Sequence, residues 1–352
     1  MKNAYLKLLV LTLVFAFTLA CSKDDDNQDK PEAPIAVTDV YAVGYEQVGS
    51  NARSATIWKN GIATHLTNGA THAQINDVFV SGADVYMAGF EYRPSPSYDY
   101  DPIFWKNGEK TVLPTYKGRR GIANAVYVYN GNIFIAGVEI VSTDTWQYQP
   151  VLWRNGVRIV LDGHDIDTFQ ADDIIVNDDD VYVVGTASVN DVPHAVLWKN
   201  GVKTALTNQV NYSRAYSVAI SGNDIYVAGI QNGTATLWKN GVASPLSVGT
   251  SSSISLYVSG NDIYTTGNSS GLIGSYGQYS KNSAPPVTLS PKSNFSLATS
   301  IFVSATDVYV GGYIKDETSQ KIAAVYWKNG EEVFLTDLNG SAVVRSIFVT
   351  KN

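Results

Sequence analysis

Short apolar segments separated by turn residues recur along the chain from residue 39 to its end. One type has an aromatic residue between apolar neighbours and then a glycine, as in Val-Tyr-Ala-Val-Gly at residues 40–44. A second apolar run, such as Val-Phe-Val at residues 78–80, precedes most copies and is joined to them by a tight turn containing Gly, Asn or Asp. β-Branched and aromatic residues in such short runs predict buried strands.

A third signature follows each pair of runs: a tryptophan, a basic residue, an asparagine and a glycine. Asn-Gly is the strongest short-range signal for a hairpin, so a fourth strand is expected after each copy. Successive copies lie 40 to 48 residues apart, which is the length of a four-stranded propeller blade. The copies begin at Trp58, Trp105, Trp153, Trp198, Trp238 and Trp327, with a divergent one, Ser-Lys-Asn-Ser, at residues 280–283.

The pattern therefore predicts an all-β fold, a seven-bladed β-propeller with strands A to D in each blade. The two ends of the chain complement each other. Residues 39–44 form a B strand without an A strand before it, and residues 345–349 form an A strand without a B strand after it. We expect these two strands to pair in one blade and to close the ring. The six tryptophans at the repeat position are expected to pack inside the blades.

The repeat resembles the tryptophan-containing blade repeats of bacterial extracellular propellers, and the resemblance covers nearly all of residues 39–352. The Trp-Asp and His signatures of WD40 blades and the Gly-Gly pair of kelch blades are missing. The resemblance implies a fold and says little about function, because propellers serve many functions.

The first residues have the pattern of an export signal. Lys2 and Lys7 precede an apolar run over residues 8–20, which has the length of a signal-peptide core and is short for a membrane-spanning helix. The run ends at Cys21, the only cysteine, so no internal disulfide is possible. Thr-Leu-Ala-Cys at residues 18–21 resembles a lipobox with Thr in place of the usual Leu. The resemblance implies a signal peptide over residues 1–20 and a lipid anchor on Cys21.

Residues 21–38 are polar and have too few apolar side chains to fold alone, which predicts a tether. Ser-Lys-Asp-Asp-Asp at residues 22–26 resembles the surface-export signal of Bacteroidota lipoproteins. This resemblance implies an outer-membrane lipoprotein on the cell surface. The alternative is a soluble spacer without a role in export.

Charge and motifs limit the possible activities. Removal of Lys2 and Lys7 takes the formal charge from −7 to −9, so nucleic acid is not an expected partner. The chain has no nucleophile elbow, zinc-protease motif, phosphate loop or dinucleotide fingerprint. No cofactor is expected, and binding is favoured over catalysis. A polysaccharide-degrading glycosidase or lyase using acidic residues of neighbouring blades is the alternative. The four histidines are dispersed: His65, His72, His164 and His194.

The connections between strands are unequal. The A–B and C–D turns are short and alike, whereas the B–C and D–A connections vary in length and content. In a propeller the variable connections share one face, and we expect ligand binding on this variable-loop face. The connections placed there span residues 93–101, 115–121, 140–149, 163–170, 209–214 and 268–278.

Aromatic residues gather in these connections. Trp146 lies outside the repeat position and is followed by Tyr148, while Tyr98 and Tyr100 occupy the equivalent loop of the preceding repeat and Tyr116 the loop between. Rings beside polar side chains suit sugars, whose C–H faces stack while their hydroxyls need hydrogen-bond partners. We therefore predict a cell-surface binding module for a glycan or an envelope protein. The alternatives are that the rings pack the loops together, and that the ring is a structural scaffold of an envelope complex.

Two charged pairs complete the candidate site. Arg119 and Arg120 could bind a carboxylate of an acidic ligand, or they could be solvated loop residues. Asp165 and Asp167 have the alternating spacing of a loop-based calcium site, although the glycine and distal glutamate of an EF-hand are missing. Calcium is an alternative rather than an expected ligand.

Overall fold

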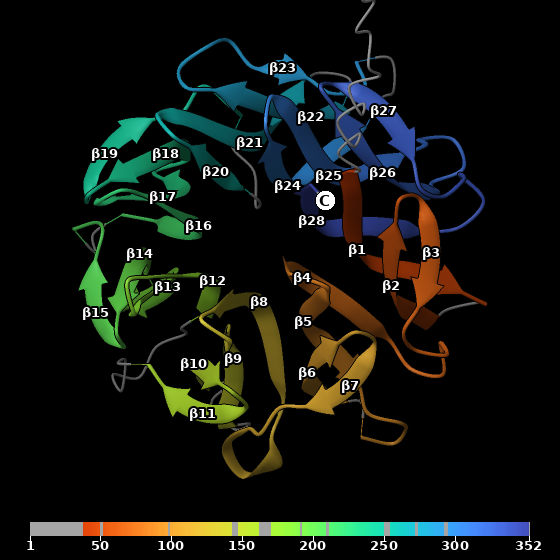
Figure 1. Ribbon diagram of the computed structural model, residues 1–352, viewed down its shortest axis with the longest axis horizontal. Helices are drawn as coiled ribbons and strands as arrows, with labels where there is room; N and C mark the ends of the chain where they lie inside the picture. The colour runs from red at the N-terminus through yellow and green to blue at the C-terminus, as the bar shows by residue number, and fades with distance from the viewer. Residues whose placement is uncertain are drawn as a thin grey trace, which may run out of the picture. The chain divides into compact units, whose positions relative to one another are not determined.

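The structure is a computed structural model that describes most of the propeller region. The described residues are 38–49, 52–97, 99–142, 147–161, 170–190, 192–208, 211–249, 254–271, 274–291 and 295–351. Seven four-stranded antiparallel sheets are arranged as blades in a ring (Figure 1). The predicted fold class, an all-β seven-bladed propeller, is confirmed.

In each blade the strands are given from the A strand, which lines the centre of the ring, outward to the D strand. Blade 1 contains β28 (Ala342–Lys351), β1 (Thr38–Val48), β2 (Ala52–Lys59) and β3 (Ile62–His65). Blade 2 contains β4 (Ala73–Ser81), β5 (Asp84–Tyr92), β6 (Tyr100–Lys106) and β7 (Glu109–Val112). Blade 3 contains β8 (Gly121–Tyr129), β9 (Asn132–Ser142), β10 (Gln147–Arg154) and β11 (Val157–Val160). Blade 4 contains β12 (Gln170–Asn177), β13 (Asp180–Val189), β14 (Val192–Lys199) and β15 (Val202–Ala205).

The remaining blades follow in chain order. Blade 5 contains β16 (Ser213–Ser221), β17 (Asp224–Gln231), β18 (Thr234–Lys239) and β19 (Val242–Pro245). Blade 6 contains β20 (Leu256–Ser259), β21 (Asp262–Gly271), β22 (Gly274–Lys281) and β23 (Val287–Thr288). Blade 7 contains β24 (Ser296–Ser304), β25 (Asp307–Lys315), β26 (Ile322–Lys328) and β27 (Glu331–Phe334).

The closure of the ring is confirmed. β1 pairs antiparallel with β28, with Val40 opposite Val349 and Ala42 opposite Ile347. Ala42 is fully buried, and Val40, Ile347 and Val349 are each less than a tenth exposed. The first and last described strands therefore share one hydrophobic core, and the inner edge of blade 1 is occupied by the end of the chain.

The Trp-Lys-Asn-Gly repeat has a structural cause that is clear in blade 1. Asn60 adopts a positive φ of 51° in the hairpin turn. Its Oδ1 accepts the Val40 N–H at 2.8 Å, and its Nδ2 donates to Asp39 Oδ1 at 2.7 Å. Lys59 Nζ lies 3.1 Å from the other carboxylate oxygen of Asp39 and covers the Tyr41 ring. One asparagine and one lysine thus tie the C–D hairpin to the start of the B strand.

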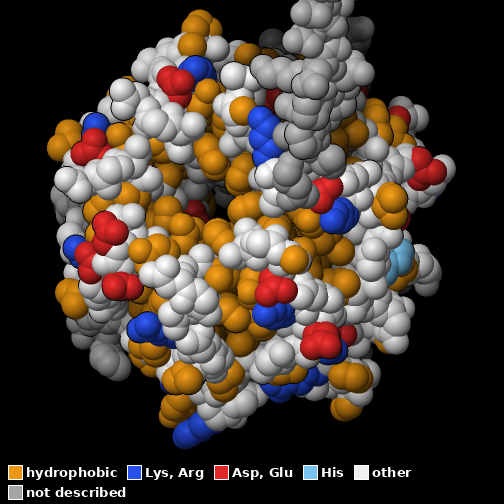
Figure 2. All heavy atoms as spheres, in the orientation of Figure 1, with side chains coloured by type: hydrophobic (Ala, Val, Ile, Leu, Met, Phe, Trp, Pro, Cys, Tyr) orange, Lys and Arg blue, Asp and Glu red, His pale blue; other side chains and the backbone are white. Residues whose placement is uncertain are grey.

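The same contacts recur around the ring, including in the divergent blade 6. There Lys281 Nζ lies 2.7 Å from Asp262, and Asn282 Oδ1 accepts the Ile263 N–H at 2.8 Å. Figure 2 shows neighbouring acidic and basic side chains around the ring. The repeat tryptophans are buried as predicted: Trp58, Trp105, Trp153, Trp198, Trp238 and Trp327 are each 0% exposed.

One predicted loop is mostly strand. The stretch 268–278 was expected as a B–C connection, but β21 and β22 continue through it, with Asn268 opposite Gly277 and Ser270 opposite Ser275. Its Ser, Gly and Asn residues lack strand propensity. The ladder nevertheless extends into this stretch, because β21 and β22 are already paired from Tyr264 and Lys281 onward.

Candidate functional site

The A strands surround a central channel with a cavity of about 590 Å³. Most A strands carry a β-bulge at the same height, for example between Ile75 and Asp77 in β4 and between Ala171 and Asp173 in β12. A bulge places an extra residue in the strand and re-aims its side chains. As a result, two successive polar residues in several A strands, such as Asn76 and Asp77, line the cavity.

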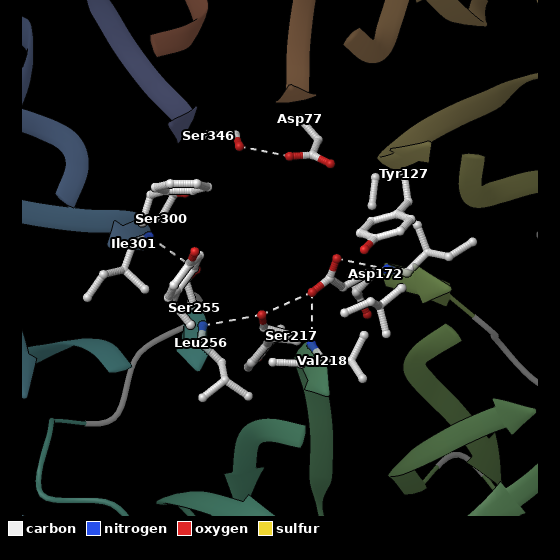
Figure 3. Close-up of a pocket in the computed structure, with 18 of the residues that line it drawn as sticks. Asp77, Tyr127, Asp172, Ser217, Val218, Ser255, Leu256, Ser300, Ile301 and Ser346 are labelled. Carbon is white, nitrogen blue, oxygen red and sulfur yellow. Dashed lines mark hydrogen bonds between the residues drawn. The ribbon is translucent and has the colours of Figure 1, made fainter. Parts of the chain in front are cut away.

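The second residue of the bulge in blades 1, 2, 4, 5 and 7, together with Ser255 of blade 6, forms a polar belt that links neighbouring blades (Figure 3). Ser346 donates to Asp77 Oδ1 at 2.7 Å, and Asp77 Oδ2 accepts the Val126 N–H of the next blade at 2.8 Å. Asp173 Oδ2 likewise accepts the Ser217 hydroxyl at 3.0 Å and the Val218 N–H at 2.8 Å. The belt continues when Ser217, Ser255 and Ser300 accept the backbone N–H groups of Leu256, Ile301 and Ile347.

Blade 3 interrupts this belt. It has Ala125 at the belt position, which offers no acceptor to the next blade. Asp173 compensates, because its Oδ1 accepts the N–H of the adjacent Ile174 at 2.8 Å. Both oxygens of Asp173 are therefore engaged by neutral donors.

The channel carboxyl groups are strongly perturbed. Burial raises the pKa of Asp77 to about 7, against hydrogen bonds from Val126 and Ser346 that favour the carboxylate, and the charge of Asp173 raises it further. Burial likewise raises the pKa of Asp172 to about 7, although the positive charge of Arg214 opposes the shift. Burial also raises the pKa of Asp173. Asp77 and Asp172 can therefore exchange protons near neutral pH.

Two residues beyond the belt, the A strands of blades 1, 2, 3, 6 and 7 each place an aromatic side chain in the channel wall. The rings of Tyr127, Phe79, Phe348, Phe302 and Tyr257 form a continuous arc, with successive centroids 4.7 to 5.2 Å apart. The arc is open at blades 4 and 5, because the equivalent residues there are aliphatic. Figure 2 shows hydrophobic side chains around the central hollow. The channel thus has a polar layer and an aromatic layer.

A second group of aromatic residues lies on the variable-loop face of blade 2. The Tyr100 ring lies 5.5 Å from that of Tyr92 and 6.1 Å from that of Phe90, and His72 meets Tyr92 edge-on at 5.7 Å. We call Phe90, Tyr92 and Tyr100 the blade 2 cluster. A cavity of about 220 Å³ adjoins it, lined by Arg53, His72, Ala73, Gln74, Phe90 and Tyr92.

The structure brings three of the predicted site residues together. The Arg120 guanidinium lies over the Tyr100 ring at 5.9 Å. Burial raises the pKa of the Tyr100 hydroxyl, and nearby Tyr148 raises it further. Tyr116 makes other contacts: its N–H donates to Glu139 at 2.7 Å, and its ring, 37% exposed, lies beside Arg158.

The two predicted arginines are both occupied within the protein. Arg120 forms a close ion pair with Asp99, which also lies 3.6 Å from Arg93. Arg119 donates to the Val141 carbonyl at 2.8 Å. The other predicted positions lie outside the described residues: Cys21, Tyr98, Trp146, Asp165 and Asp167.

Sequence reasoning missed the channel acids and two arginines, Arg53 and Arg345. The available signal was a polar pair inside otherwise apolar A strands, such as Asn-Asp at 76–77, Asp-Asp at 172–173 and Arg-Ser at 345–346. In the described part of the chain, no group of three or more His, Cys, Asp or Glu side chains is placed to hold a metal ion. No helix among these same residues is long and apolar enough to cross a membrane.

No protein-family model and no curated protein matches the chain. Among solved structures, the β-propeller domain of the Trilobed protease from Pyrococcus furiosus matches with a TM-score of 0.50 and 12% identity over 86% of this chain and 95% of that one. Acylaminoacyl peptidase from Pyrococcus horikoshii matches with a TM-score of 0.49 and 11% identity over 86% of this chain and 51% of that one. A thermostable family-43 glycoside hydrolase has a TM-score of 0.38 and 10% identity over 76% of this chain and 95% of that one.

At such identities the likeness concerns the fold alone. The chain is a seven-bladed β-propeller. The domain from Pyrococcus furiosus is described as having an open velcro topology, whereas pairing of β1 with β28 closes blade 1 here.

Proposed function

We propose that this protein is a lipid-anchored binding module of the outer membrane, exposed on the cell surface, that holds a glycan on its variable-loop face. The blade 2 cluster carries the proposal, because it combines adjacent rings with a cavity and polar side chains. Phe90 and Tyr92 line that cavity together with Gln74 and His72. Rings can stack on the apolar faces of a sugar while the polar side chains bind its hydroxyls.

A glycan array probed with the full chain in detergent tests the proposal. Tyr100→Ala should weaken binding of the captured glycan by about tenfold or more, as expected at a binding hot spot. Trp146→Ala should act in the same way if its loop contributes to the site. Tyr212→Ala is the matched control, because Tyr212 is 44% exposed and lies in the connection from blade 4 to blade 5, away from the blade 2 cluster. Equal affinities for Tyr100→Ala, Trp146→Ala and the unsubstituted chain would contradict the proposal.

The channel supports a second candidate, a polysaccharide-degrading enzyme. Asp77 and Asp172 have pKa values raised to about 7 by burial, which suits a general acid that must be protonated near neutral pH. Incubation of the protein with the captured glycan and mass spectrometry of the products distinguishes the two functions. Shortened products that disappear in Asp77→Asn and Asp172→Asn would favour the enzyme, and an intact glycan favours the binding module.

A further inference from the structure

Arg53 and Arg345 lie beside the blade 2 cluster and form no ion pair with any carboxylate among the described residues. The arginines that do form ion pairs are Arg93, Arg120 and Arg158. Arg53 lies over the Tyr45 ring at 4.4 Å. Arg345 has a single long hydrogen bond, from Nη2 to Gln74 Oε1 at 3.5 Å. Most of the donors of both guanidinium groups therefore have no partner in the described part of the chain.

The two side chains connect the two cavities. Arg53 and Gln74 line the cavity of about 220 Å³ beside the blade 2 cluster. Arg345 lines the central channel and reaches Gln74 from that side. An anionic group placed near Gln74 can therefore meet one guanidinium on each side.

The charges around the pair make a bound anion favourable. Burial lowers the pKa of Arg345, the phenol groups of Tyr45 and Tyr313 oppose this, and the positive charge of Arg53 lowers the pKa further. Two acids on neighbouring strands are occupied elsewhere, because Glu46 contacts His65 at 2.9 Å and Glu91 contacts Lys110 at 2.8 Å. Both side chains are solvent-accessible, and two neighbouring positive charges without a counter-ion repel each other, so an anion placed between them is favoured.

We infer that Arg53 and Arg345 bind the anionic group, a carboxylate or a sulfate, of an acidic sugar whose ring occupies the adjoining cavity. This inference rests on the proposed glycan-binding function and specifies the class of glycan. Arginine matches carboxylate and sulfate oxygens with paired N–H donors. Phe90 and Tyr92 provide the apolar wall for the sugar ring. A nucleic-acid ligand would not suit a chain with a formal charge of −7.

The geometry also explains why the arginines predicted from sequence do not fill this role. The charge of Arg120 is neutralised by Asp99, and Arg119 is held by a backbone carbonyl. Arg53 and Arg345 are separated by almost the whole chain and meet only because β28 and β1 close blade 1.

Calorimetric titration of the full chain in detergent tests the inference. The probes are an oligogalacturonate, the same oligosaccharide with its carboxylates methyl-esterified, and a sulfated oligosaccharide of chondroitin type. The acid should bind, and the methyl ester, which is uncharged but similar in shape, should bind about tenfold or more weakly. Affinity for the acid should fall as salt rises from about 0.05 to 0.5 M, because the screening length shortens.

Arg53→Gln and Arg345→Gln should each reduce affinity for the acid about ten- to a hundredfold and leave affinity for the ester unchanged. Arg154→Gln is the matched control, because Arg154 also forms no ion pair among the described residues but stacks on Phe134 at 5.2 Å beside the hairpin turn of blade 3. Arg53→Gln should fold in any case, since its side chain is exposed. Without ligand it should melt at the same or a higher temperature than the unsubstituted chain.

The outcomes separate this inference from the proposed function. Equal binding of acid and ester with unaffected arginine variants overturns the inference and leaves the glycan-binding function standing. Failure of every glycan to bind overturns the proposed function. A preference for the sulfated probe that depends on both arginines supports the inference and identifies the anionic group. A melting temperature of Arg53→Gln well below that of the unsubstituted chain would show a structural role instead.

Discussion

The protonation of Asp77 should make the stability of the propeller depend on pH. Its pKa rises from 3.8 to about 7 on folding, mainly because of burial. Between these values the folded chain binds a proton that the unfolded chain has lost. The stabilising contribution is therefore fully present below pH 3.8 and is lost as pH rises through about 7. At about 1.4 kcal/mol per pH unit, a shift of this size corresponds to about 4 kcal/mol.

Asp77→Asn removes this titration and keeps an oxygen that can accept the Val126 N–H. We expect the variant to match the unsubstituted chain near pH 4 and to be more stable at pH 8 by up to about 4 kcal/mol. Urea unfolding followed by tryptophan fluorescence between pH 4 and 8 measures the difference. Asp84→Asn is the control: ion pairing with Lys106 lowers the pKa of half-buried Asp84 to about 2, so its contribution is lost only as pH falls toward 2. A free-energy difference for Asp77→Asn that does not change with pH would refute the reasoning.

Three further perturbations test the anchor, the closure and the packing. Cys21→Ser should move the protein from the detergent phase to the aqueous phase on phase separation, and unchanged partitioning would argue against the lipid. Deletion of residues 344–352 removes most of β28, whose buried aliphatic side chains each contribute about 1.5–3 kcal/mol against a typical total of about 5–15. It should cause aggregation on size exclusion, and a monomer with unchanged melting temperature would contradict closure. Trp198→Ala should cost about 3–5 kcal/mol and Trp146→Ala less than about 1, measured by urea unfolding; equal losses would make Trp146 a packing residue.

The blades could be predicted because their signals are local. A hairpin such as β2–β3 is encoded by a few adjacent residues, with Asn60 supplying the positive φ of 51° that the turn requires. Repetition then multiplies a weak signal seven times, and even Ser-Lys-Asn-Ser at 280–283 keeps the contacts of Asn282 and Lys281. Closure could be predicted because the two incomplete repeats at the chain ends complete each other.

The polar channel and the roles of Arg53 and Arg345 could not be predicted in the same way. Asp77 and Asp173 come from blades that are not adjacent, and only the ring geometry places each charge near the other. Arg119 and Arg120 were candidates because they are adjacent in a loop. In the structure, however, Arg120 forms an ion pair with Asp99, and Arg119 donates a hydrogen bond to the Val141 carbonyl. Whether a charged side chain is paired depends on contacts between residues that are far apart in the sequence. Composition and local motifs do not reveal those contacts.

One set of departures from the repeat lies next to the proposed site. Blade 3 replaces the aspartate, tyrosine and lysine of the hairpin-turn contacts with Asn132, Phe134 and Arg154, and it supplies Ala125 where the belt needs an acceptor. It also supplies Tyr148, next to Tyr100 in blade 2. On the face formed by the A–B and C–D turns, the other blades pair each repeat lysine with an aspartate. These charges are therefore not available to bind a ligand. The unpaired donors of Arg53 and Arg345 lie where blades 1 and 2 meet, and the perturbed acids of blades 2 and 4 line the channel. A ligand that supplies an anion to Arg53 and Arg345 would complete the interactions that the described residues leave open.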